Sequence, residues 1–193
     1  MKILFKENPA SYLAVFILGV IAGLLVVLFC EFPNNELWSF YYWSSDTFGF
    51  WMFSTALIVL YSEKRKIAAV NASLYIFLMF LITTIYKSFH MYWNGYTHFE
   101  SLAELSTHHM SGWFLYSIPP AILCGVLGAI LWSGRKNNIY GKILCVSPAI
   151  FIFLETILLF YNVFTEHMKL FSAMSDLACL ITYCLILRRA FSN

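Results

Sequence analysis

The sequence contains few charged residues. Of its 193 residues, 11% are Asp, Glu, Lys or Arg, whereas 61% are hydrophobic, and the mean hydropathy is +0.73. Soluble domains carry about 25% charged residues. A water-soluble chain of this length has no core large enough to hide so much apolar surface. The scarcity of charge therefore excludes a soluble protein and predicts an integral membrane protein.

Paired cysteines are also missing. None of the five cysteines forms a CxxC motif, and only Cys30 is expected to face an oxidising compartment. An odd number of cysteines with a single such candidate argues against a disulfide framework. The other four fall within apolar stretches, where a cysteine packs as a small apolar side chain.

Motifs that identify an enzyme do not occur. The sequence has no HExxH, no GxSxG, no phosphate-binding GxxxxGK[ST] and no dinucleotide fingerprint. A membrane-embedded enzyme built from scattered residues stays open as a third-ranked function. No cofactor, no metal and no nucleic-acid partner is expected.

Long apolar stretches are abundant instead. Six of them reach or approach the ~20 residues that cross a bilayer as a helix. They lie at about 11–30, 47–62, 67–86, 112–133, 143–162 and 171–188, with the second the shortest and weakest. The prediction is an all-α polytopic membrane protein, a bundle of six transmembrane helices that forms one integral membrane domain over residues 1–193.

The lysines and arginines predict the orientation of this bundle. Ten of the twelve lie before the first stretch or just after the second, fourth and sixth, and only Lys87 and Lys169 lie on the other side. Basic residues concentrate in short cytoplasmic loops. We therefore expect a multi-pass protein of the cell membrane with both termini in the cytoplasm.

Small residues at four-residue spacing indicate where helices approach closely. The first stretch has Gly19 and Gly23, and the fourth has Ala121 and Gly125 within a longer series of small residues. Such spacing lets helix backbones pack in lipid. We expect these two stripes to pack against each other. The alternative is that one of them docks a separate membrane subunit.

A carboxylate within the fifth apolar stretch is the main functional signal. Glu155 lies in FIFLETILLF, roughly 10 Å from the outer interface at 1.5 Å per residue. Asp176 lies near the start of the sixth stretch, which enters the membrane from the same side. Lys87 marks the outer end of the third stretch, and Asn162 lies on the same helical face as Glu155. Ionisable residues inside a membrane are candidates for a functional site. The four residues predict an outward-facing polar pocket that binds a cation, a proton or an amine-bearing solute.

Three structural explanations compete with this pocket. Glu155 forms an interhelical hydrogen bond, it pairs with Lys87 to fix packing, or Asp176 merely reaches up to the interface. The histidines offer a lesser alternative. In THFESLAELSTHHM, Glu104 and His108 are four residues apart on one helical face, and His98 or His167 would complete a metal site.

Several short segments resemble an uncharacterised bacterial integral-membrane family of unknown function with six spans. They are FGFW, RKIAAVNASLYIFLMF, GVLGAILW and FLETILLF. The resemblance implies a six-helix bundle and draws attention to Gly125, Gly128 and Glu155. The architecture also resembles the substrate-binding subunits of energy-coupling-factor vitamin transporters. Those subunits meet a partner through small residues of the first helix, where this chain has Gly19 and Gly23.

The sequence thus favours binding and transport of a small solute or ion through the polar pocket, in a lipid bilayer. The alternative is a non-catalytic membrane subunit whose small-residue stripe or aromatic outer face binds a protein partner.

Overall fold

The computed structural model describes residues 3–32, 37–43, 48–95, 99, 101–136 and 138–191. These residues form helices, and their one isolated β-bridge joins Phe5 to Ser62. The elements in chain order are α1 (Pro9–Cys30), the 3-10 helix η1 (Phe40–Trp43), α2 (Gly49–Leu60), α3 (Arg65–Trp93), α4 (Leu102–Leu131), the 3-10 helix η2 (Trp132–Arg135), α5 (Ile139–Glu166) and α6 (Leu170–Phe191).

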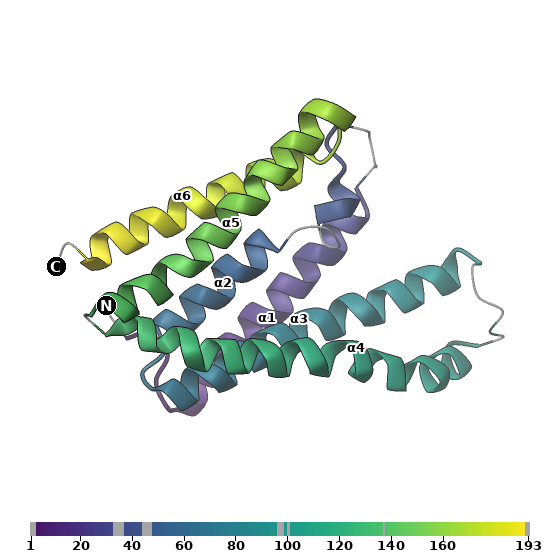
Figure 1. Ribbon diagram of the computed structural model, residues 1–193. Coiled ribbons are helices and arrows are strands. Elements are labelled where there is room, and N and C mark those ends of the chain that lie inside the picture. Colours follow the sequence, from purple (N-terminus) through teal and green to yellow (C-terminus); the bar gives the residue numbers. More distant parts are fainter. Residues whose placement is uncertain are drawn as a thin grey trace.

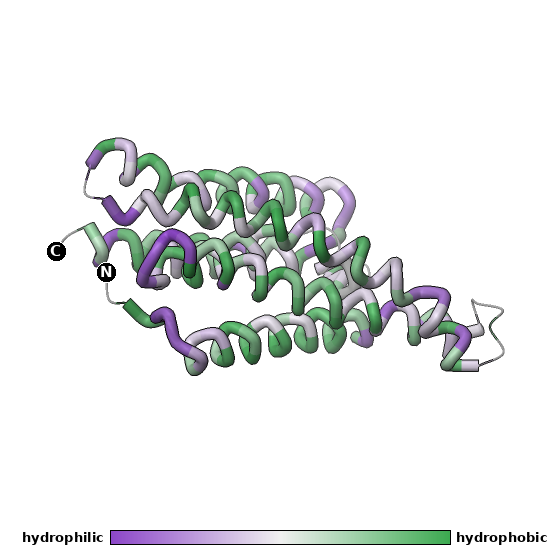
Figure 2. The backbone as a smooth tube through the Cα atoms, turned by 90° about the horizontal axis from the view of Figure 1, so that it is seen from below, coloured by the Kyte–Doolittle hydropathy of each residue, from purple (hydrophilic) through white to green (hydrophobic). Residues whose placement is uncertain are grey.

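Five of the helices are long and apolar enough to cross a membrane: α1, α3, α4, α5 and α6. The prediction of an all-α multi-pass membrane protein is confirmed to this extent. Apolar residues occupy the middle of the helices, and polar residues gather toward their ends (Figure 2). The second apolar stretch forms α2, which has 12 residues. At 1.5 Å per residue it is about 18 Å long, short of the ~30 Å hydrocarbon core.

Helices α3 and α4 extend beyond their predicted bounds. We expected spans at about 67–86 and 112–133, but α3 continues to Trp93 and α4 begins at Leu102. Packing between the two extensions explains the difference, since Trp113 Nε1 donates to Ser88 Oγ at 2.8 Å and Leu105 is fully buried. The resulting hairpin projects past the other helices (Figure 1).

Helix α2 lies at the centre of the bundle. Helices α1 and α4 pack on α3, and α5 packs on α6. The short α2 lies between these two groups and contacts α3, α4, α5 and α6 (Figure 1). Helix α1 begins and α6 ends at the same end of the bundle (Figure 1).

The two small-residue stripes face α3 rather than each other, so the expected contact between them was wrong. A Cβ atom at Gly19 would lie 3.0 Å from the Tyr75 carbonyl oxygen, and one at Gly23 would lie 2.9 Å from Ile82 Cβ. Ala121 is buried and its carbonyl accepts a hydrogen bond from Ser73 Oγ, whose side chain also fills the space beside Gly125. The backbones of α1 and α4 therefore both pack closely against α3.

Candidate functional site

Glu155 of α5 and Asp176 of α6 come together at the N-terminal end of α2, where Glu155 contacts the Phe48 N–H and the carboxyl group of Asp176 lies against Gly49. We call them the carboxyl pair. Their positions in the sequence left open whether these two residues meet. They do because α5 and α6 form a hairpin, in which a turn at His167 and Lys169, both with positive φ, reverses the chain.

Glu155 also caps the N-terminal end of α2. The Phe48 N–H donates to Glu155 Oε1 at 2.6 Å, and Phe48, the N-cap residue, offers no side-chain cap of its own. A carboxylate near a helix N-terminus satisfies a free N–H and interacts favourably with the helix dipole. Here the cap comes from another helix, which explains how a carboxylate is accommodated within an apolar segment.

Asp176 has no such compensation. Its side chain is fully buried, and no donor among the described residues reaches either Oδ1 or Oδ2. The second oxygen of Glu155, Oε2, is equally without a donor in the described part of the chain. Two ionised carboxylates have no proton to donate to each other, so their contact becomes a hydrogen bond only when one of them carries a proton. Burying unpaired polar oxygens costs free energy, and charged ones cost more.

Gly49, the first residue of α2, makes room for the pair. A Cβ atom built on Gly49 would overlap the carboxyl group of Asp176. Neither Gly49 nor the backbone of Phe48 was expected at the site. The only signal for them was the FGFW segment, where a glycine opens the second apolar stretch.

The other two predicted site residues lie apart from the pair. Asn162 is half-buried on α5, two helical turns beyond Glu155. Lys87 is exposed on the C-terminal part of α3, just beyond the predicted span that ends near residue 86. The ion pairs among the described residues are Glu7–Lys64 and Glu31–His90, so Lys87 is in neither. The explanation in which Asp176 reaches the interface is wrong, because its side chain is fully buried.

Aromatic residues cover the start of α6 next to the pair. Trp43 is almost fully buried and donates from Nε1 to Ser175 Oγ at 3.0 Å, one residue before Asp176. Its ring packs on those of Phe29 and Phe171 with centroid separations of 4.9 and 6.0 Å. These aromatic residues thus form a packed cluster rather than an open aromatic pocket.

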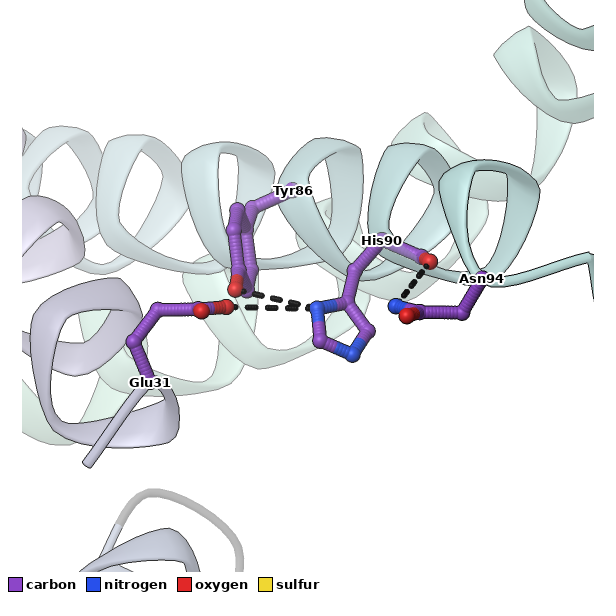
Figure 3. Close-up of polar contacts among 4 residues, drawn as sticks. All are labelled: Glu31, Tyr86, His90 and Asn94. Carbon is purple, nitrogen blue, oxygen red and sulfur yellow. Dashed lines mark hydrogen bonds and ion pairs between the residues drawn. The ribbon is translucent and has the colours of Figure 1, made fainter. Parts of the chain in front are cut away.

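One histidine, His90, contacts polar groups of two helices. His90 joins α3 to the end of α1, because its Nδ1 lies 3.2 Å from Glu31 Oε1 and 3.1 Å from the Tyr86 hydroxyl (Figure 3). Asn94 donates to the His90 carbonyl oxygen in the same group (Figure 3). Since a carboxylate only accepts, the contact with Glu31 is a hydrogen bond when Nδ1 carries the hydrogen.

Among the described residues, no three His, Cys, Asp or Glu side chains come together as metal ligands. His98, one of the residues considered for a metal site, lies outside the described residues.

No protein-family model, curated protein or solved structure matches this chain.

Proposed function

We propose that this multi-pass membrane protein binds and transports a small cation, a proton or an amine-bearing solute at the carboxyl pair. The observation that carries the proposal is the buried Asp176 side chain, which lacks a donor among the described residues and lies beside a second carboxyl group. A proton, a hard cation or an ammonium group would satisfy these oxygens, since oxygen ligands suit hard cations and an ammonium donates hydrogen bonds.

The position of α2 supports a binding role. Many transporters place their site where a discontinuous helix ends within the membrane. Helix α2 is about 18 Å long, and its N-terminal end meets the carboxyl pair inside the bundle. The helix dipole favours ionised Glu155, which leaves Asp176 as the group with more to gain from a bound proton or cation.

The proposed topology has six passes, with both termini in the cytoplasm of a cell. The distribution of basic residues supports it, and so does the arrangement in which α1 begins and α6 ends at one end of the bundle. In this topology α2 supplies one short pass, and the carboxyl pair lies nearer the outer surface.

A role as a non-catalytic subunit is the second candidate, and the glycines support it less than expected. Gly19, Gly23 and Gly125 are all buried against α3, so none of them is available to a partner helix. A partner would have to dock on another surface.

The test is the thermal stability of the purified chain against monovalent and divalent cations, pH and small amines, with Glu155→Gln in parallel. A ligand at about 100 times its Kd stabilises the folded state by about 2.7 kcal/mol. We expect a saturable rise in Tm that disappears in Glu155→Gln, because Gln keeps an acceptor for the Phe48 N–H but loses the charge. The matched control is Glu166→Gln, an exposed glutamate at the end of α5.

Asp176→Asn separates binding from packing. The new amide would donate to the neighbouring Glu155 carboxylate, so we expect the free energy of unfolding to rise by about 1–2 kcal/mol while the ligand response is lost. A variant that keeps its full response to the same ligand would contradict the proposed site. The readouts are Tm without ligand and the ligand-induced shift.

A further inference from the structure

An apolar cleft of about 460 Å³ is lined at one point by Phe48, the residue whose N–H donates to Glu155. Helices α4 and α5 form its two walls, and α2 forms its floor. The cleft exists because α4 and α5 have few contacts with each other. The volume is within the range of about 300–1,000 Å³ that is typical of small-molecule sites. Residues from all three helices line it, among them Met52, Thr55, Leu127, Leu144 and Phe151.

The α5 wall leads to Glu155. Leu144, Ser147 and Phe151 line the cleft at spacings of three and four residues, which places them on one helical face. Glu155 is the next residue on that face, four positions after Phe151. From the floor, Phe48 lines the cleft and donates its N–H to Glu155. The apolar cleft therefore reaches Phe48, next to Glu155 of the carboxyl pair.

The α2 floor carries a polar group without a partner. Thr55 lines the cleft, and its Oγ1 is buried without a hydrogen-bond partner among the described residues. Asp176 is also fully buried, and its oxygens lack a donor among the described residues. Thr55 and Asp176 are therefore two buried polar groups in this region that need a partner.

We propose that the solute is a single-chain amphiphilic amine, with its ammonium group at the carboxyl pair and its apolar chain along the cleft. This inference rests on the proposed function, since it names the class of solute for the same site. The distance from Leu144 to Glu155 is eleven residues of α5, or about 16 Å, which suits a flexible hydrocarbon chain. Charge complementarity selects a cationic head, because the cleft reaches Phe48, whose N–H contacts the Glu155 carboxyl group.

Charge excludes an anionic phospholipid as the occupant. A phospholipid would bring its phosphate beside two carboxyl groups, where like charges repel.

The experiment compares three water-soluble probes: ethylamine, octylamine and octanoate. The full chain in a non-ionic detergent is titrated with each probe, and Tm is recorded. Leu127→Trp places a large ring in the cleft, and Val126→Trp is the matched control. Val126 is the neighbouring residue on α4 and faces the groove between α3 and α4. Both side chains are exposed at the apolar surface, 49% for Leu127 and 55% for Val126, so neither substitution disturbs the core.

We expect octylamine to raise Tm at a concentration at least threefold lower than ethylamine, and octanoate to have no stabilising effect. Leu127→Trp should abolish the preference for octylamine over ethylamine, while Val126→Trp retains it. The Val126 control also accounts for the partitioning of octylamine into detergent, which is the same for both variants. Glu155→Gln should lose the response to both amines.

The outcomes separate the two proposals. A preference for octylamine that survives Leu127→Trp would overturn the amphiphile inference, while an ethylamine response that depends on Glu155 would still uphold the proposed function. An absence of any Glu155-dependent response to amines, cations or protons would overturn both.

Discussion

The two ends of α2 differ in whether the polar groups beside them have hydrogen-bond partners. At its C-terminal end, the turn formed by residues 61–64 (the Ser62 turn) is surrounded by donors. The Ser62 carbonyl oxygen accepts from Trp132 Nε1 at 3.1 Å and from Arg135, and Ser62 Oγ accepts from Asn71 and donates to the Ile58 carbonyl oxygen. At the N-terminal end, Glu155 Oε2 and both Asp176 oxygens have no donor among the described residues.

Both environments are buried, but only one has its hydrogen bonds nearly complete. The unpaired atom at the Ser62 turn is Oδ1 of the neutral Asn71 amide. The carboxyl pair has three unpaired oxygens on groups that can carry charge, where the penalty is larger. A satisfied network fixes structure, whereas each unsatisfied buried group calls for an explanation such as a bound ion or a functional role. The Ser62 turn therefore serves the architecture of the bundle, and the carboxyl pair is where we propose a function.

Removing a hydrogen-bond donor from the Ser62 turn, at the C-terminal end of α2, should have the largest effect on stability. Arg135→Met removes a charged donor from the Ser62 and Glu63 carbonyl oxygens and the cation that lies 5.5 Å from the Trp132 ring centroid. We expect a loss of about 1.5–3 kcal/mol, since hydrogen bonds to charged groups are worth that much. Chemical unfolding in detergent measures it, with the exposed neighbour Lys136→Met as control. Equal stability of the two variants would show that Trp132 alone satisfies the turn.

Adding a methyl group at Gly49, at the N-terminal end of α2, should destabilise the protein somewhat less. In Gly49→Ala, the methyl group would overlap the Asp176 carboxyl group and push the pair from α2. We expect about 1–3 kcal/mol of destabilisation from overpacking and a weaker ligand response. Gly112→Ala is the control, because a Cβ atom there would meet only Tyr116 at 3.9 Å. A Gly49→Ala variant that matches the control in Tm would mean that Asp176 has room to move.

The smallest effect should come from the exposed ion pair beside the Ser62 turn. Glu7 accepts from Lys64 Nζ at 2.7 Å, and this hydrogen bond, followed by the Lys64 charge, lowers the pKa of Glu7 below its ordinary value of 4.5. The same contact raises the pKa of Lys64 above 10.5. The stabilisation is therefore present at neutral pH. It is lost at low pH as Glu7 becomes protonated below 4.5, and at high pH as Lys64 loses its proton above 10.5.

Glu7→Gln should remove the part of the acid sensitivity of Tm that arises from this pair. Because both side chains are exposed, we expect a shift near the detection limit, and one that high salt suppresses in the parent chain. The comparison is with Glu166→Gln, which should leave the pH profile unchanged. A large shift in Glu7→Gln would show that the N-terminal segment, held to the turn by the Glu63 N–H to Phe5 carbonyl bond at 2.8 Å, depends on its charge.

Much of the helical layout could be predicted from the sequence, because apolar length is a local property. Residues 9–30 and 170–191 form helices close to the predicted spans. The extensions of α3 and α4 could not be predicted in the same way, since Trp113 and Ser88 stabilise them only when the two helices are paired. The glycines of α1 were recognised as packing residues, but their partner was misidentified. Small-residue spacing specifies a close approach without specifying which helix approaches.

Hydropathy and residue order are sufficient to predict a membrane protein with Glu155 and Asp176 inside its apolar helices. Three features are visible only in the folded chain: the two carboxyl groups come together at the start of α2, Lys87 lies on a different part of the bundle, and the N-terminal end of α2 faces Glu155. These depend on how α5, α6 and α2 pack. In lipid, packing follows the fit of side chains between helices, which no single helix carries in its own sequence.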